Sequence, residues 1–348
     1  MRRAFLTRFI TGGIASYQKL VARLERKWEN RHPRSFRNYS LFKNGIHSTL
    51  VDLNDLRLVW SRIALDNRPV SQTLNTMTRR ELFVFRQVPQ DILRAAPLML
   101  LAPLPGTFLL YPLFFAYPRL FLTRQFWTGE QRAQFDQDKL DRRMKILPDL
   151  ILTDLHRHVT NLRADWNTST LVLQHFYLFD SIYHQIKSGV RPSVEILTQL
   201  IPLFSGPLAL EKLPRSYVID LCKLHDLTIR LVPDRPSTVH VSKLLALIEP
   251  SRMHSRRLRR LRARSHLFIA EDRLLRRDFT ELNGSFAIDK DECLATCVLR
   301  GIDPFRTDTK EVARQLRSWI ACSLADSESN HSFRLHLPIF LFHRTCSG

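Results

Sequence analysis

The chain has none of the short sequence motifs on which most enzymes depend. Its 348 residues contain no G-x-x-x-x-G-K phosphate loop, no G-x-G-x-x-G dinucleotide fingerprint, no G-x-S-x-G nucleophile turn and no H-E-x-x-H zinc helix. A loop of the EF-hand type for calcium is absent as well. These absences argue against an enzyme, and we predict no catalytic residue, no cofactor and no small-molecule substrate.

Cysteine is scarce, and its spacing suits neither disulfides nor metal. The five cysteines are odd in number, which is unlike the framework of a secreted domain and favours a reducing compartment. Cys222 with His225, and Cys293 with Cys297, have helical spacing. Each pair supplies only two ligands where structural zinc needs four, so we predict no metal site.

Acidic residues are absent from the first 24 positions. Basic residues there alternate with apolar ones at helical spacing, and an acid-free, basic and amphipathic start is typical of a mitochondrial transit peptide. We predict a transit peptide over 1–24, followed by a helical lead-in over 25–94. The alternative is that the start of the chain is a basic first helix of the mature protein.

Charge is also absent between Arg94 and Arg119, where 24 uncharged residues follow one another. A helix needs about 20 such residues to cross the hydrocarbon core of a bilayer. Prolines in this stretch kink a membrane helix more than they forbid it, because neighbouring helices or local 3₁₀ geometry satisfy the freed carbonyls. We predict one Pro-kinked transmembrane helix over 95–118. A Pro-broken segment of a buried core is the alternative, and the flanking charges leave the topology open.

Positive charge, by contrast, is abundant. The 53 Lys and Arg residues against 33 Asp and Glu give a formal net charge of +20, which favours nucleic acid or anionic lipid as partners. Beyond the uncharged stretch, apolar residues recur at helical spacing and no array of strands is visible. We predict an all-α protein in which residues 119–330 form a helical bundle and residues 331–348 form a C-terminal tail.

The most polarised segment of the bundle runs from 251 to 279. One narrow face of a helix there is formed by Leu258, Leu261, Ser265, Phe268, Asp272 and Leu275. The arginines predicted to point outward are Arg256, Arg257, Arg259, Arg260, Arg262 and Arg264. Planar guanidinium groups suit phosphate, so RNA phosphates or anionic lipids are the predicted ligands. The alternative is a solvated basic face that binds nothing.

Two short helices are predicted next along the chain. Asp289 and Glu292 have the spacing of a capping box, and Gly301 stands where a left-handed helix end belongs. After a loop, the apolar face of the second helix consists of Val312, Leu316, Trp319 and Ile320. The pair is similar in outline to helix-loop-helix modules that bind nucleic acid.

Three stretches together share the pattern of one known family. The first comprises Asp91, Arg94, Pro97, Pro105 and Pro112 at and in the uncharged stretch. The others are YPRLFLTRQFWTGEQ at 117–131, and DECLATCVLRGI at 291–302 followed by LRSWI. Over roughly 79–324 the chain resembles the leucine-zipper-EF-hand-containing transmembrane (Letm) proteins of mitochondria, most closely the short type without EF-hand and coiled-coil extensions.

The resemblance implies a single-pass protein of the mitochondrial inner membrane with its C-terminal domain in the matrix. That domain is expected to bind the mitochondrial ribosome, through rRNA or ribosomal proteins, and to support mitochondrial organisation and ion homeostasis. Membrane lipid is a further expected partner, and a homo-oligomer is left open.

Two other functions are left open by the sequence. One is a component of a cation/proton exchange system, although family members assigned exchange have an acidic residue where this chain has Phe108. No ionisable group lies between Arg94 and Arg119 to carry a cation or proton. The other is a soluble nucleic-acid-binding protein whose apolar stretch is core.

Overall fold

The structure is a computed structural model that describes the chain in segments. The described residues are 23, 26–27, 29–31, 33–66, 70–101, 122–165, 170–227, 251–281, 290–325 and 330–342. Every regular element within them is a helix, and the predicted all-α class is confirmed. The predicted transit peptide lies outside the described residues except for Arg23.

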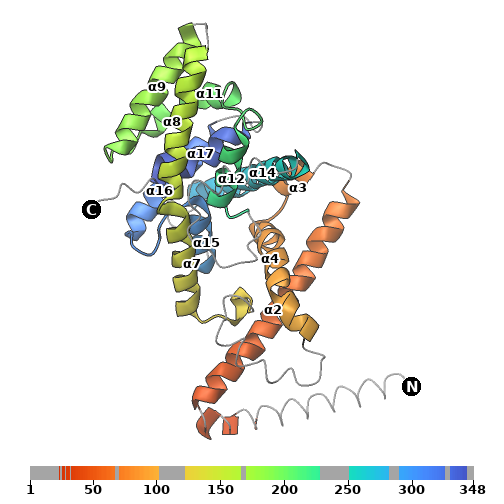
Figure 1. Ribbon diagram of the computed structural model, residues 1–348. Helices are drawn as coiled ribbons and strands as arrows, with labels where there is room; N and C mark the ends of the chain where they lie inside the picture. The colour runs from red at the N-terminus through yellow and green to blue at the C-terminus, as the bar shows by residue number, and fades with distance from the viewer. Residues whose placement is uncertain are drawn as a thin grey trace. The chain divides into compact units, whose positions relative to one another are not determined.

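The helices in the first part of the chain are α2 (Pro33–Leu65), α3 (Val70–Asn75), α4 (Arg79–Leu101), the 3₁₀ turn η2 (Arg124–Phe126) and α7 (Gly129–Met144). Those that follow are α8 (Leu147–Asp165), α9 (Thr170–Lys187), α10 (Val194–Thr198), α11 (Ile201–Ser205) and α12 (Arg215–Leu224). The last are α14 (Ser251–Glu281), α15 (Lys290–Arg300), α16 (Thr309–Leu324) and α17 (His331–Phe342), all labelled in Figure 1 where there is room.

The chain divides into two compact units. The first unit takes residues 1–64 and 83–132, and the second takes 65–82 and 133–348. The bundle predicted over 119–330 therefore has its first residues in the first unit and the rest in the second. Each unit has its own core.

In the first unit, α2 packs closely against α4 and the segment around η2. A Cβ added to Gly45 would lie 2.6 Å from the ring of Phe126, so only glycine allows this approach. Gln125 donates from Nε2 to Asp52 Oδ2 over 2.8 Å. Leu56 of α2 is buried in one small core with Val84 and Val88 of α4. One side of α2 is thus occupied by protein.

Two capping boxes explain where α4 and α7 begin. At α4, Thr78 N–H donates to Glu81 Oε2 over 2.7 Å while Glu81 N–H donates to Thr78 Oγ1 over 3.3 Å. At α7, Thr128 and Gln131 exchange the same pair of bonds at 3.1 and 3.2 Å. Each pair satisfies two backbone donors that a helix start otherwise leaves without partners.

The predicted transmembrane helix is covered only in part. Helix α4 continues through residue 97 and ends at Leu101, and residues 102–118 lie outside the described residues. Among the described helices, none is both long enough and apolar enough to cross a bilayer.

The core of the second unit is built around α17. The eleven residues of this helix from Ser332 to Phe342 are buried and His331 is half-buried, and α17 contacts α8, α11, α14 and α16 (Figure 1). The prediction of a C-terminal tail is therefore wrong for residues 331–342. A helix that is buried on every side has no polar face, and it therefore lacks the amphipathic pattern by which helices are recognised in a sequence.

Aromatic rings fill the space around α17. The ring of Phe204 in α11 lies 5.8 Å from Phe333 and 5.9 Å from Phe340, measured between ring centroids. Phe179 of α9 meets Phe340 edge-on at 6.5 Å. Edge-to-face and tilted contacts of this kind add to the hydrophobic effect of burying the rings.

Candidate polyanion-binding face of helix α14

The inner face of α14 is the one that the sequence predicts. Leu261, Ser265, Phe268, Asp272 and Leu275 are buried, and Leu258 is half-buried against the same core. Their three-four spacing places them along one side of the helix. The apolar stripe predicted for this segment is confirmed, including its two polar members.

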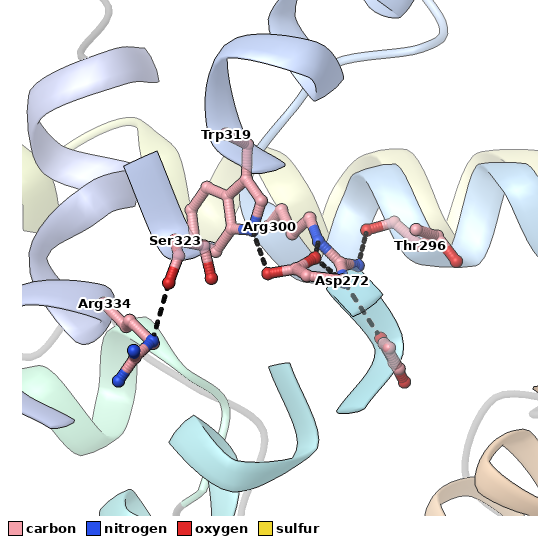
Figure 2. A network of polar contacts seen from close by, with 7 residues as sticks. Asp272, Thr296, Arg300, Trp319, Ser323 and Arg334 are labelled. Carbon is pink, nitrogen blue, oxygen red and sulfur yellow. Dashed lines mark hydrogen bonds and ion pairs between the residues drawn. The ribbon is translucent and has the colours of Figure 1, made fainter. Parts of the chain in front are cut away.

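The rotation of α14 is fixed by a buried ion pair between α14 and α15. Arg300 donates from Nη2 to Asp272 Oδ1 over 2.7 Å and from Nε over 3.1 Å (Figure 2). Its Nη2 also donates to Glu271 Oε2 over 3.2 Å, and its Nη1 to the Thr296 carbonyl over 3.1 Å. Trp319 of α16 donates its indole N–H to Asp272 Oδ2 over 3.0 Å. One carboxylate thereby connects three helices.

Burial makes this network costly to disturb. Desolvation raises the pKa of Asp272, although Arg300 and Trp319 both act in the opposite direction. The Arg300 guanidinium also lies over the rings of Phe268 and Trp319, at 5.5 and 5.9 Å from their centroids. A buried charge whose partner is removed keeps its full desolvation penalty, so this cluster holds α14 in one orientation.

With that orientation, part of the predicted arginine set faces solvent. Arg256, Arg259 and Arg260 are exposed, and Arg260 donates from Nη1 to the Leu227 carbonyl over 3.2 Å. Arg252, which the sequence analysis did not single out, is exposed too. Positions 252, 256 and 259 are spaced by four and three residues and share one side of the helix.

Other members of the predicted set do not face solvent. Arg264 is buried at 5% exposure, and the prediction that it points outward is wrong. It follows Leu261 by three residues and precedes Phe268 by four, so it lies on the buried side of the helix. Arg257 is half-buried because it precedes Leu261 by four residues and so lies toward the same side of the helix. Arg262 is half-buried as well.

Beside the exposed arginines of α14, Arg262 is paired with an acidic residue, Glu211. Arg262 donates from Nε to Glu211 Oε1 over 3.2 Å. Burial alone would raise the pKa of Glu211, but the hydrogen bond and charge of Arg262, with His331, lower it overall. His331 itself contacts Ser265 Oγ through Nδ1 at 3.2 Å, and burial with nearby positive charge lowers the pKa of His331 to about 4. Glu211 therefore offsets the charge of Arg262 at this edge, and His331 is uncharged near neutral pH.

No acidic residue precedes Glu271 in α14. Over its first five turns the helix thus presents the side chains of Arg252, Arg256, Arg259 and Arg260 without a carboxylate on the same helix. We call these four residues the arginine face. Its chemistry is that of a site for phosphate groups on a polymer, since Arg binds phosphate through paired N–H donors.

The predicted helix-loop-helix unit is present as α15 and α16. Gly301 has φ of +90° and follows α15, and Ile302 N–H donates to the Cys297 carbonyl over 3.0 Å, as in a Schellman end. The buried residues of α16 include Val312, Leu316, Trp319 and Ile320. Asp289 lies outside the described residues and the Glu292 side chain is not described, so the predicted capping box stays a prediction.

Two further buried arginines hold helix ends together, and sequence reasoning missed both. Arg143 donates from Nε to the Leu224 carbonyl over 2.6 Å, and from Nη1 and Nη2 to the carbonyls of Val298 and Leu299 over 3.0 and 3.1 Å. These carbonyls belong to the last turns of α12 and α15, where backbone acceptors lack helical partners and the helix dipole is negative. Arg143 thus caps two helices at once.

Arg334 of α17 does the same for α16. Its Nε donates to the carbonyl of Ser323 over 2.9 Å (Figure 2). Its Nη1 donates to the carbonyl of Asn330, also over 2.9 Å. Arg143 gives no local sequence signal, because the carbonyls that it binds belong to elements distant in the chain. Both arginines are part of the framework and are withdrawn from solvent.

The residues of the predicted membrane motif are only partly described. Asp91 is buried in α4, and Gln87 donates from Nε2 to its Oδ1 over 3.0 Å. Arg94 and Pro97 lie in α4, but their side chains are not described. Pro105 and Pro112 lie outside the described residues, so this part of the motif stays a prediction.

The cysteine and histidine pairs noted in the sequence lie in the protein core or against it. Cys222 is buried in the core, and His225 contacts the Leu335 carbonyl through Nε2 at 2.8 Å. Cys297 is buried beside half-buried Cys293. Across the described segments, no three His, Cys, Asp or Glu side chains gather as metal ligands.

Comparison with known proteins places the whole domain in one family. The chain matches the family model described as "LETM1-like, RBD" over residues 77–340. LETM1 domain-containing protein 1 of Xenopus tropicalis is 25% identical over 334 residues, which cover 94% of this chain and 83% of the relative. The Homo sapiens protein of the same name is 22% identical over 313 residues, covering 89% of this chain and 76% of the relative. No solved structure matches the chain. The matched residues include both the arginine face and the buried network that orients it. Because the family model matches most of the chain, the chain belongs to the LETM1-like family.

Proposed function

We propose that this protein binds the mitochondrial ribosome through the arginine face of α14 and holds it at the inner membrane. The observation that carries the proposal is a run of exposed arginines on a helix whose rotation is fixed by a buried ion pair. Family membership supports the mitochondrial setting and the class of partner. Support of mitochondrial organisation and ion homeostasis belongs to the same proposal.

The arginine face suits RNA phosphate for a physical reason. Neutralising a phosphate releases condensed counterions, so a surface of several arginines gains affinity at low salt and loses it as salt rises. A fixed helix presents its guanidinium groups without first ordering the backbone, which lowers the entropy cost of binding. Acidic ribosomal proteins would use the same charges but show a different salt dependence.

Membrane attachment is proposed from the uncharged stretch at 95–118. Its length suffices to enter the hydrocarbon core. Because Asp52 before the stretch accepts a hydrogen bond from Gln125 after it, both flanks lie on one side of the membrane, which we propose is the matrix side, where ribosomes are. We do not propose cation exchange, because this stretch has no ionisable side chain of the kind that intramembrane transport uses.

The proposal can be tested by sedimentation with purified mitochondrial ribosomes. The full chain in lipid nanodiscs is compared with a variant in which Arg252, Arg256 and Arg259 are changed to Gln. Glutamine keeps helix propensity, and the buried stripe is untouched. If each arginine neutralises one phosphate of single-stranded RNA, the slope of log affinity against log salt becomes shallower by about 2.

A matched control removes the same charge elsewhere. Arg157, Arg191 and Arg314 are exposed on other parts of the second unit, and a triple Gln variant there should bind ribosomes like the unchanged protein. Equal binding and equal salt slopes for both triple variants would overturn the proposal, and would show that the arginine face is a solvated surface.

A further inference from the structure

Helix α2 exposes apolar residues on the side that faces away from its protein contacts. Leu50 and Leu58 are 61% and 60% exposed, and Ile46 and Val51 are 41% and 42% exposed. At 100° per residue these four positions fall within an arc of about 140° along one side of the helix. Soluble monomers rarely leave an ordered row of large apolar side chains in water.

The other side of the helix is already in use. Gly45 lies against Phe126, Asp52 accepts a hydrogen bond from Gln125, and Leu56 and Val59 are buried. The row of exposed apolar residues is therefore an additional face beyond the one that packs on α4. It extends over the thirteen residues from Ile46 to Leu58, about 18 Å at the rise of an α-helix.

Charge on the exposed apolar side has a single sign. Lys43 and Arg57 are exposed within the same arc. The two acidic residues of α2 lie elsewhere: Asp52 is buried, and Asp55 is half-buried beyond the edge of the arc. Apolar and basic side chains that share one side of a helix, without carboxylates, match a bilayer surface whose headgroups are anionic.

We propose that this face, made of Lys43, Ile46, Leu50, Val51, Arg57 and Leu58, binds the surface of an anionic bilayer. The four apolar side chains enter the boundary between headgroups and acyl chains. Lys43 and Arg57 extend their aliphatic stems along it and place their charges among the phosphates. Helix α2 then lies in the membrane surface as a second attachment beside the uncharged stretch.

The position of α4 favours a bilayer as the occupant. From residue 83 onward helix α4 belongs to the same unit. It exposes Ile92 and Leu93 just before Arg94, after which the uncharged run begins. If that run enters a bilayer, the unit that contains α2 is held at the membrane surface, where lipid is at high effective concentration. The positive sign of the face complements anionic lipid and disfavours a second copy of itself.

The inference is tested by photocrosslinking of the full chain in vesicles. A photoreactive amino acid replaces Leu50 or Leu58 in one pair of proteins, and Ser48, exposed on α2 outside the face, in a control. Each protein is reconstituted in vesicles of phosphatidylcholine with or without an anionic lipid. We expect lipid adducts from positions 50 and 58 at least fivefold above position 48, with a higher yield in anionic vesicles. Equal yields at all three positions would overturn the inference.

A second variant tests the charge. Changing Lys43 and Arg57 to Gln, in the protein with the probe at position 58, should remove the extra yield in anionic vesicles and leave the yield in neutral vesicles unchanged. Crosslinked dimers in place of lipid adducts would overturn the inference in favour of a face between copies of the chain. Circular dichroism of each variant establishes that α2 is still helical.

The inference rests on the proposed attachment to membrane, but the two can fail separately. If the chain does not float with vesicles after alkaline carbonate treatment, the membrane anchor fails and this surface fails with it. If the chain floats while positions 50 and 58 form no lipid adduct, the anchor stands and only the α2 surface is wrong.

Discussion

Asp272 and Arg300 form a fully buried ion pair in which Oδ1 of the carboxylate accepts from both Nη2 and Nε of the guanidinium. The second carboxylate oxygen is occupied by the indole N–H of Trp319. Each charge therefore has its partners inside the protein. Pairs of this kind add little net stability as a whole, but removal of one partner leaves the other charge buried and uncompensated.

The first prediction concerns this pair. Asp272→Ala should lower the free energy of unfolding by about 3–5 kcal/mol, because Arg300 keeps its desolvation cost without its carboxylate. Urea unfolding of the full chain in detergent, followed by tryptophan fluorescence, measures the loss. The control is Asp141→Ala, which breaks an exposed pair with Arg306 and should cost about 1 kcal/mol or less. Equal losses in the two variants contradict the assignment of Asp272 as a buried anchor.

The second prediction concerns the end of α15. Gly301 has φ of +90°, and a Cβ there would lie 3.0 Å from Sδ and Cε of Met144. Gly301→Ala should therefore destabilise the second unit by about 1–3 kcal/mol, since strain and crowding act together. Gly129→Ala is the matched control, because a Cβ there meets nothing within 4 Å among the described residues and lies in the first turn of a helix. Thermal unfolding should show a fall in Tm for the first variant and none for the second.

The third prediction concerns pH. Burial lowers the pKa of His336 to about 4, while His336 Nδ1 donates to the Ser332 carbonyl and Nε2 accepts from the Tyr217 hydroxyl. In the unfolded chain the pKa of a histidine is about 6.5, so between pH 6.5 and 4 the unfolded state binds more protons. Stability is then lost as pH falls through this window, by up to about 1.4 kcal/mol per pH unit for one histidine. His225, whose pKa burial also lowers, adds to the slope.

Unfolding by urea at a series of pH values checks this prediction. His336→Asn should be less stable at pH 7 but should show a shallower loss below pH 6.5, because one titrating group is gone. An unchanged slope in this variant would contradict the role given to His336.

The fourth prediction concerns α17. Phe340 is 1% exposed and contacts the rings of Phe179 and Phe204. Phe340→Ala should cost about 3–5 kcal/mol, since it removes a buried ring and leaves a cavity in a close-packed core. Tyr177→Ala, at an exposed ring of α9, removes a similar volume and should cost far less. Similar midpoints for the two variants in chemical unfolding would contradict the prediction, and residues 331–342 would then be a peripheral tail.

Local periodicity was sufficient to predict α14. Leu261 and Phe268 mark the buried side at helical spacing, and Ser265 and Asp272 could be placed on it although both are polar. The position of each outward residue then follows from the same period. Arg264 was misplaced because a run of arginines was interpreted as exposed without counting residues from Leu261.

Long-range relationships were not available from the sequence. Arg143 caps carbonyls that lie 81 and 155 residues away along the chain, and nothing near Arg143 indicates those partners. Helix α17 was missed for a different reason, because it contains Pro338 and has no polar face. The predicted transit peptide and most of the predicted span lie outside the described residues, and they stay predictions.

The central position of α17 has a consequence for how the protein is made. Ribosomes release a chain from its amino terminus onward, so α8, α11, α14 and α16 all emerge before the helix that they surround. Until α17 arrives, rings such as Phe179 and Phe204 lack the partner that Phe340 provides, and they leave aromatic surface open to aggregation. The second unit therefore completes its core only after α17 has been synthesised, and until then the rings that α17 covers are exposed to solvent.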